Sequence, residues 1–598
     1  MTDVTNTLPL KEVKPKSSRD DWTMRGFMLM IGAYLLIALA FPLYIMLSKS
    51  FENKDGMFIG VDNYIKYFST PALFNSIENS ITVSMVTMVI TVTLAFIYAY
   101  ALTRSCMRFK GFFKIMAMIP ILVPSLLPGL GLIYMLGNQG YLKKPLVKKI
   151  GELIEWLFGS DALAFMSPYL TSLKNYLSSI DIYGAKGIII AEVFFTFPHA
   201  LLIIMTALAI SDGRLYEAAT VLRAPKWKIF WTVTLPGARY GLISAAFVVF
   251  TLVITDFGVP KVIGGQYNVL AVDIYKQVIG QQNFSMGAVV SVVLLIPAIF
   301  AFYIDRQVQK KQVSQLSARA VPYEPKPDKS FDTLMMSYSS LIVLIIVTIL
   351  ATCQFAALVK FWPYNLSLGL QHYNFDLMDG GGWDAYYNSI QLALWTAAVG
   401  TSIVFTGAYM VEKGRGFGAG RTAFQFLAMM PMAVPGMVLG LSYIFFFNNP
   451  DNPFNFIYGT MAILVVSTVT HFYTVAHLTA MTALKQMDKE FESVSQSLQQ
   501  PFYKMFLTVT VPVCTPAILE IAIYLFVNAM TTVSAVVFIY SYHTQLASVA
   551  VLNMDDAGDI APAAAMGMMI FYTNAGARIL HTVVSKVLVN KTQAWRQR

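Results

Sequence analysis

The chain is poor in the residues that support disulfide scaffolds and soluble surfaces. Only 3 of its 598 residues are cysteine, and only 13% are charged. The three cysteines lie far apart, which excludes a disulfide framework and a metal site of the Cys-x-x-Cys type. An ordinary soluble domain carries about 25% charged residues. A chain this long with so few charges does not have the surface of a soluble protein.

Motifs for cofactors and catalysis are also missing. The nearest candidate for a phosphate-binding loop, residues 416–422, lacks both the lysine and the glycine spacing that hold phosphates. The six histidines do not follow metal-ligand spacing, and no catalytic constellation is clustered in the sequence. We therefore expect a chain that is not an enzyme and binds no cofactor or metal of its own.

What the chain does have is long apolar runs. It is 56% hydrophobic and its mean hydropathy is +0.59. Because a helix needs about twenty apolar residues to cross a bilayer, about twelve stretches qualify, six in each half. They are Phe27–Leu47, Ile77–Leu102, Ile115–Leu136, Gly187–Ile210, Gly241–Phe257, Met286–Ile304, Leu334–Val359, Ile390–Val411, Ala423–Phe447, Met461–Leu484, Ala517–Ser541 and Ala561–Thr582. The expected fold is an all-α polytopic membrane protein with two tandem six-helix repeats.

Polar stretches divide the chain. Residues 1–26 form a tail, 27–305 a first half, 306–332 a linker, and 333–598 a second half. Lys and Arg gather in loops on the side of the N-terminus and aspartates on the opposite side, which is the positive-inside pattern. We expect a multi-pass protein of a bacterial inner (plasma) membrane with cytoplasmic N- and C-termini. The net charge of +10 then reflects orientation in lipid, and we expect no nucleic-acid partner.

An internal repeat supports this division. The first match pairs Asn79-Ser80-Ile81 with Asn388-Ser389-Ile390, and Pro120 and Pro124 with Pro431 and Pro435. The prolines lie in the middle of their stretches, where they predict kinks. A second match pairs residues 212–225 with 488–501, at a smaller offset. The first half must therefore carry an insertion, residues 141–186, on the outer side. Its segment 145–158 has helical amphipathic spacing, which predicts contact with the outer leaflet or with a partner protein on that side.

The repeated segment carries a family resemblance. Glu217-Ala218-Ala219, followed by Leu235-Pro236, resembles the EAA loop of ABC importer permeases. The resemblance implies a cytoplasmic helix-turn-helix that docks in a cleft of an ATPase subunit. Two copies of the loop imply two ATPase subunits, which hold ATP and Mg, and one periplasmic substrate-binding protein. The candidate coupling residues are Asp212, Glu217, Ala218, Ala219, Pro225, Pro236, Asp488, Glu492, Ser493, Pro501 and Pro512.

The two copies depart from the family pattern. Arg223 and Gln499 stand where the family has glycine, and Ser493 replaces the acid of the second copy, with Glu492 just before it. A different interpretation of the loop is a helix that rests on the lipid surface, since Trp227 and Trp231 lie beside lysines. The matching register of the two copies favours docking to a partner, because a lipid anchor needs no such register.

Acids inside apolar stretches are costly and are candidates for function. Asp256 and Glu192 are such acids, and their repeat partners Thr532 and Thr468 are neutral. The candidates for the transport pathway are Asp256, Thr532, Thr531, Ser534 and Glu192. The alternatives are that the acids lie at the membrane interface, where charge is cheap, and that the hydroxyls serve helix packing.

The same resemblance implies that the solute is a small polar compound. The fused layout and residues 255–265 are similar to the ferric-iron and 2-aminoethylphosphonate branch of the permeases, and the stretch to Asn283 favours 2-aminoethylphosphonate or another organophosphorus compound. A ferric iron importer is the alternative. A secondary transporter driven by an ion gradient is a rival from another class, but it would have no use for paired docking loops.

Overall fold

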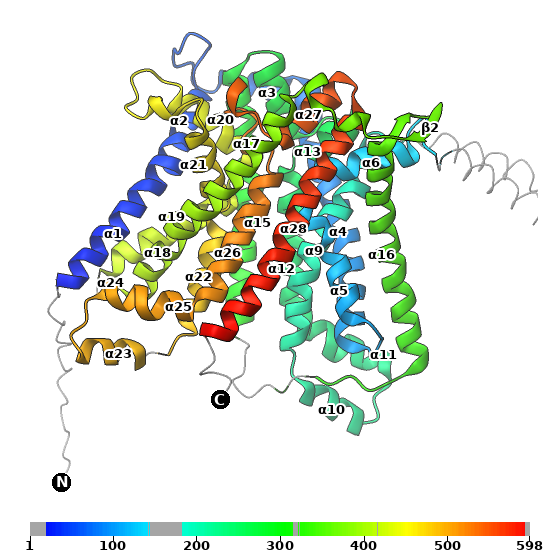
Figure 1. Cartoon of the computed structure of the whole chain (residues 1–598), viewed down its shortest axis with the longest axis vertical. Coiled ribbons are helices and arrows are strands. Elements are labelled where there is room, and N and C mark those ends of the chain that lie inside the picture. The colour runs from blue at the N-terminus through cyan, green and yellow to red at the C-terminus, as the bar shows by residue number, and fades with distance from the viewer. Residues whose placement is uncertain are drawn as a thin grey trace, which may run out of the picture.

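The structure is a computed structural model that describes residues 19–141, 143, 182–314, 321, 323–414, 417–488 and 490–592 (Figure 1). It confirms the all-α fold, since one two-stranded hairpin is the only sheet within these residues. Most of the predicted insertion, including segment 145–158, lies outside the described residues. The predicted linker is shorter than residues 306–332, because helices extend into both of its ends.

Helices of the first half run along the chain with few long breaks. They are α1 (Arg19–Leu35), η1 (Leu36–Ala40), α2 (Phe41–Lys49), α3 (Asp62–Ser69), α4 (Pro71–Arg104), α5 (Lys110–Met118), η2 (Ile119–Leu122), α6 (Leu126–Leu136), α9 (Ala185–Ile210), α10 (Gly213–Val221), α11 (Lys226–Ile229), η4 (Phe230–Thr234), α12 (Leu235–Thr255), α13 (Gly258–Ile263), α14 (Leu270–Tyr275), η5 (Lys276–Gly280) and α15 (Phe284–Ser314).

The second half repeats this order and adds the hairpin. Its elements are α16 (Lys329–Leu358), β1 (Val359–Phe361), β2 (Asn365–Leu368), η6 (Gln371–Tyr373), η7 (Phe375–Leu377), α17 (Gly382–Trp395), η8 (Thr396–Gly400), α18 (Thr401–Lys413), α19 (Gly418–Met429), η9 (Met430–Ala433), α20 (Gly436–Phe447), η10 (Asn455–Ile457), α21 (Met461–His471), α22 (Tyr473–Lys485), α23 (Glu490–Ser497), α24 (Phe502–Met505), η11 (Phe506–Thr510), α25 (Val511–Val513), α26 (Thr515–Thr531), η12 (Tyr542–Thr544), α27 (Ala547–Ala557) and α28 (Ile560–Thr592).

By length and apolar composition, the described residues hold 7 membrane-spanning helices, or up to 11 if each of four bent helix pairs is one span. These account for eleven of the twelve predicted stretches. The twelfth, Ala561–Thr582, lies on α28, which is 33 residues long but less apolar because it carries Asn574, Arg578 and His581. With each bent pair taken as one span, length and composition support eleven of the twelve predicted spans within the described residues.

The prolines that were predicted to kink helices break them instead. The helices bend by 102° between Leu122 and Leu126, and by 112° between Ala433 and Gly436. Proline lacks an N–H and collides with the preceding turn, so two prolines four residues apart end one helix and start another. A 57° bend at Phe472 has no proline and was not predicted. The expected span Ala517–Ser541 is also wrong at its end, because α26 stops at Thr531.

The first helix of each half packs on the other half. The α1–α2 helix contacts α18, α19 and α20, whereas α16 contacts α4, α5 and α6. Two tyrosines fix these crossings. Tyr443 donates a hydrogen bond to the Ala38 carbonyl at 2.7 Å, and Tyr338 donates to the Leu94 carbonyl at 2.9 Å. The halves are therefore intertwined in one body.

The repeated Asn-Ser pair has a structural role. Ser80 accepts a hydrogen bond from the first amide of α14, Leu270, at 2.8 Å, and Ser389 accepts one from the first amide of α27, Ala547, at 2.8 Å. The neighbouring asparagines bond the carbonyls just before these helices. The motif therefore positions the same short helix in each half, since an unpaired helix amide buried from water is costly.

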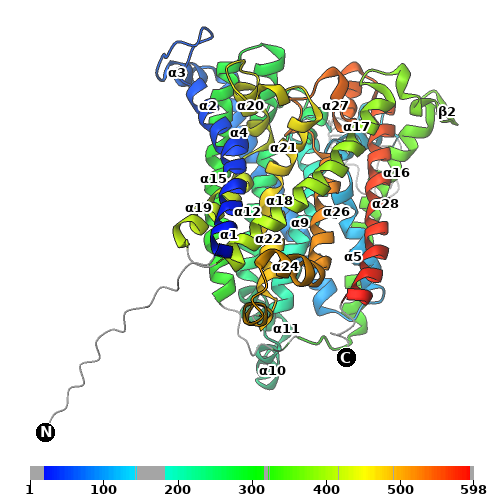
Figure 2. The same cartoon turned by 60° about the vertical axis from the view of Figure 1, so that its left-hand side comes forward.

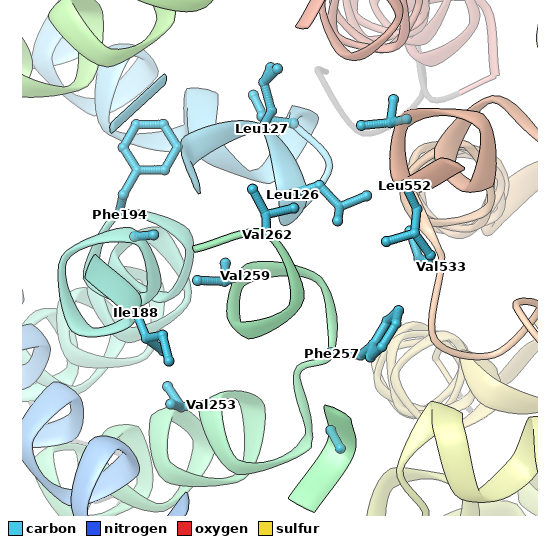
Figure 3. Packing of buried hydrophobic residues seen from close by; sticks show 14 of the residues in the cluster. Leu126, Leu127, Ile188, Phe194, Val253, Phe257, Val259, Val262, Val533 and Leu552 are labelled. Carbon is cyan, nitrogen blue, oxygen red and sulfur yellow. The ribbon is translucent and has the colours of Figure 1, made fainter. Parts of the chain in front are cut away.

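The halves meet at the α27 end of the bundle. Leu126 and Phe257 of the first half lie near Val533 and Leu552 of the second (Figure 3). Lys261 forms an ion pair with Asp556 across the seam at 2.8 Å. Burial, together with the adjacent Asp556 carboxyl, raises the pKa of Asp555 to about 7. At the opposite end of the bundle, α10 and α23 lie well apart (Figure 1).

Candidate coupling and pathway sites

The two predicted coupling loops have the same backbone. In the first, Asp212 caps α10 by accepting a hydrogen bond from the Arg214 amide at 3.0 Å. In the second, Asp488 accepts one from the Glu490 amide at 3.0 Å. Pro225 and Pro501 then precede α11 and α24 with nearly identical dihedral angles. Pro236 and Pro512 follow a π-helical turn in both halves.

The position of the missing family glycine is left-handed in both loops. Arg223 has φ of 52° and Gln499 has φ of 53°. Positive φ is easy for glycine and strained for other residues, which explains why glycine suits this turn. In each loop the preceding residue, Leu222 or Leu498, bonds back to the carbonyl four residues earlier. The two loops therefore share this left-handed turn although neither has the family glycine.

Both loops present uncovered apolar side chains. On α10, Val221 is 82% exposed and Leu222 is 81% exposed, with Glu217 and Ala218 exposed beside them and Ala219 half-buried. On the second loop, Val494 and Leu498 are exposed. An apolar centre with a charged rim is the pattern of a protein interface. We call these two surfaces, Glu217–Leu222 and Ser493–Leu498, the coupling faces.

Glu492 does not take the place of Glu217. It is half-buried and forms an ion pair with Lys413, the last residue of α18. The equivalent contact in the first half joins Arg104, at the end of α4, to Tyr216. The Arg104 guanidinium lies 5.1 Å from the Tyr216 ring, and its Nε donates to the Tyr216 hydroxyl at 3.3 Å. Glu492 therefore positions α23 on the bundle, as Tyr216 positions α10.

Sequence comparison of the halves missed Arg104 and Lys413. Their side chains differ, so no identity marks them. Their positions in the repeat are equivalent, because each ends the membrane-span candidate that contains the Asn-Ser pair, and that equivalence was the available signal.

The chain segment between the halves lies against the first coupling loop. Gly213 donates to the Val321 carbonyl at 2.8 Å, and the Tyr323 ring lies 4.4 Å from the Tyr216 ring. Lys226 forms an ion pair with Asp328, and this hydrogen bond lowers the pKa of the Asp328 carboxyl. The N-terminal helix does the same for the second loop, where Asp20 accepts from the Phe502 amide at 2.9 Å.

The two predicted pathway acids are brought together. Glu192 is fully buried on α9 and faces Asp256, which follows the last residue of α12. No other described residue gives either oxygen of Glu192 a hydrogen bond. Asp256 accepts one from the Val259 amide at 2.8 Å and one from the Ser125 hydroxyl. This acid pair lies beside the break between η2 and α6, and broken helices are the setting in which transporters place solute and ion sites.

The hydroxyl candidates of the second half are less clearly placed for a pathway. Thr532 is buried, and its carbonyl accepts from Ser548 at 2.6 Å. Thr531 bonds carbonyls of its own helix. Ser534 is half-buried against Gly436. Within the described residues no group of three His, Cys, Asp or Glu side chains could hold a metal ion.

A serine and a glycine exchange places between the halves. A Cβ on Gly258 would lie 2.3 Å from the Ser125 Oγ, and a Cβ on Gly436 would lie 2.3 Å from the Ser534 Oγ. Gly258 and Ser534 occupy equivalent positions of the repeat, as do Ser125 and Gly436. Each half thus joins its bent third span to the turn after its fifth span through one serine and one glycine.

This exchange predicts a rescue. We expect Gly258→Ser to lower the free energy of unfolding by about 1–3 kcal/mol, because it adds a second hydroxymethyl group to a filled site. Adding Ser125→Gly gives the first half the glycine and serine placement of the second half. We expect this change to restore at least half of the lost free energy of unfolding. Thermal unfolding of the two single variants and the double variant measures the coupling. A double variant less stable than either single variant would contradict the equivalence.

Comparison with known proteins decides the family. Residues 92–313 and 413–589 match the family described as binding-protein-dependent transport system inner membrane component. These regions hold both coupling loops and the acid pair. The chain belongs to this family. The two matches within one chain confirm the fused two-half form that the sequence predicts.

Individual relatives of this permease family carry different solute names. The ferric transport system permease protein FbpB of Actinobacillus pleuropneumoniae is 28% identical over 78% of this chain, and a putative ferric transport system permease of Haemophilus influenzae is 28% identical over 70%. The aligned regions span 65% and 62% of those proteins, a little under two thirds of their length. A putative 2-aminoethylphosphonate transport system permease of Salmonella typhi is 25% identical over 25% of this chain and 53% of its own.

One solved structure is also similar. The crystal structure of a bacterial alginate ABC transporter, in complex with alginate pentasaccharide-bound periplasmic protein, aligns with 48% of this chain and 96% of the matched chain. The identity is 15% and the TM-score 0.37. A similarity of this size says nothing about the solute of the present chain.

Proposed function

We propose that this chain is the membrane permease of an ATP-driven, binding-protein-dependent importer. The observation that carries the proposal is the pair of coupling faces, which lie at one end of the bundle with the same left-handed turn. A protein that engaged one partner would need one such face, and an ion-driven transporter would need none. Membership of the family supports the same function.

The partners follow from this layout. Each coupling face takes one copy of an ABC ATPase subunit, which holds ATP and Mg and supplies the hydrolysis. The end that carries α10 and α23 then faces the cytoplasm, together with the start of α1 and the end of α28, as the distribution of Lys and Arg predicts. A periplasmic substrate-binding protein delivers the solute to the α27 end.

For the solute we propose ferric iron ahead of 2-aminoethylphosphonate. The sequence alone favours 2-aminoethylphosphonate, but relatives named as ferric permeases align with more than two thirds of this chain, and the one named for 2-aminoethylphosphonate with a quarter. The acid pair supports this choice, because carboxyl oxygens are the ligands that hard cations prefer.

A transport assay tests the proposal. The chain, its ATPase and its binding protein are reconstituted in liposomes, and ATP hydrolysis and uptake are measured with ferric iron, 2-aminoethylphosphonate and no solute. We expect ferric iron to stimulate both. Stimulation by 2-aminoethylphosphonate alone would keep the importer and overturn the solute. ATP-independent uptake driven by an ion gradient would overturn the importer.

A further inference from the structure

Two small elements at the α27 end carry apolar side chains that nothing in the described residues covers. One is the hairpin segment, residues 359–370, which follows α16. The other is the α3 segment, residues 57–69, which follows α2. They lie at opposite sides of the bundle (Figure 2). We propose that both are anchors that lie in the headgroup region of the bilayer leaflet at the α27 end.

Strand β2 of the hairpin segment alternates polar and apolar side chains. Side chains alternate between the faces of a strand, so Leu366 and Leu368 share one face while Asn365 and Ser367 share the other. Both leucines are exposed, and Tyr364 at the turn is 77% exposed. The Phe361 and Tyr364 rings stack at 5.7 Å. Such a surface is unstable in water but suits a boundary between hydrocarbon and water.

The length of α16 places the hairpin segment at this boundary. The helix has 30 residues, which span about 45 Å at 1.5 Å per residue. A bilayer with its headgroups is about 40–45 Å thick. Because α16 starts at the α10–α23 end, its last residue reaches the headgroups of the opposite leaflet. The exposed residues Leu341, Leu344 and Ile345 extend the lipid-facing surface of α16 toward the hairpin segment.

The hairpin segment is also held in a fixed orientation. Trp362 donates a hydrogen bond from Nε1 to the Gln139 carbonyl at 3.0 Å. Its ring lies 6.2 Å from that of Tyr134 and 6.1 Å from that of Tyr141. Trp362 thus ties the hairpin segment to α6, and the leucines remain on the outside. Lys360, which is exposed, supplies the positive charge that anionic headgroups attract.

The α3 segment repeats this design in the first half. The α1–α2 helix has 31 residues and so also spans about 46 Å. Val61, Ile65 and Phe68 fall on one face of α3 and are exposed, while Tyr67 on the other face is fully buried. Phe58, just before α3, is 78% exposed. The same connection in both halves therefore ends in an exposed apolar surface at the same depth, which a partner protein on one side would not require.

Lipid quenching tests the anchors. In a Cys106→Ser background, whose other cysteines are buried, single variants Tyr364→Cys, Leu366→Cys and Ile65→Cys are labelled with bimane. Tyr542→Cys is the matched control, because Tyr542 is 86% exposed between α26 and α27. The proteins are placed in phosphatidylethanolamine–phosphatidylglycerol nanodiscs, with or without lipids that carry a nitroxide at acyl carbon 5.

We expect the nitroxide lipids to quench the labels at 364, 366 and 65 at least twofold, and the label at 542 by less than a fifth. Iodide in the water should quench them in the opposite order. Equal lipid quenching at 364 and 542 would overturn the proposal for the hairpin segment, and equal quenching at 65 and 542 would overturn it for the α3 segment. Labels shielded from iodide only after the binding protein is added would point to a protein partner and would also overturn it.

Discussion

A charge placed on each coupling face should abolish ATPase docking. We expect the double variant Leu222→Asp, Leu498→Asp to lose at least 90% of its bound ATPase and of its solute-stimulated ATP hydrolysis. Both leucines are exposed at the ends of α10 and α23, so their replacement should not unfold the bundle. Losing an apolar side chain at an interface hot spot costs about 2 kcal/mol or more, which is about 30-fold in affinity at each face.

The single variants separate the two faces. We expect Leu222→Asp and Leu498→Asp each to retain one ATPase per chain, measured by quantitative pull-down. Tyr542→Asp is the control, since it places the same charge on an equally exposed residue at the α27 end. Full ATPase binding by the double variant would mean that the coupling faces are not docking sites.

Removing the charge of Asp256 should nearly stop transport of the cation. We expect Asp256→Asn to reduce ferric iron uptake at least tenfold while the protein stays folded. Asparagine keeps an oxygen that can accept the hydrogen bond of the Val259 amide, so the start of α13 is preserved. What is lost is the negative charge that the two facing carboxyl groups can carry between them, since both cannot be ionised together in a low-dielectric region.

The repeat offers a matched control for this variant. Thr532 occupies the position of Asp256 in the second half, and its role in the structure is carried by its carbonyl. Thr532→Val should therefore leave uptake within twofold. If Asp256→Asn transports normally, the acid pair is a structural contact. If Asp256→Asn also lowers the unfolding temperature well below that of the unmodified protein, the loss of uptake comes from folding and not from the pathway.

The features of the fold that follow from local sequence patterns could be predicted from the sequence. Apolar runs marked the spans, and Pro120, Pro124, Pro431 and Pro435 marked the two sharpest breaks. The aligned segments after the fourth span of each half indicated two equivalent loops, and these have the same backbone. The acid pair was also foreseeable in part, because Glu192 and Asp256 each stood out as an acid in an apolar stretch, although nothing in the sequence indicated that they touch.

Other features depend on contacts that no local pattern encodes. Residues 532–541 are apolar because they are buried between the halves, and apolarity alone does not distinguish a buried turn from a membrane span. The bend at Phe472 has no proline. The packing of α16 on the first half follows from helix surfaces that meet only after folding. Glu492 was a candidate coupling residue next to Ser493, and its pairing with Lys413 was visible only in three dimensions.

The central claim is that one chain provides both halves of the permease and both ATPase docking faces. The most direct test is the mass of the complex that forms when the purified chain is mixed with an excess of its ATPase, measured by native mass spectrometry. The account predicts one chain with two ATPase subunits. A complex with a single ATPase per chain, or one that needs a second copy of this chain, would contradict it.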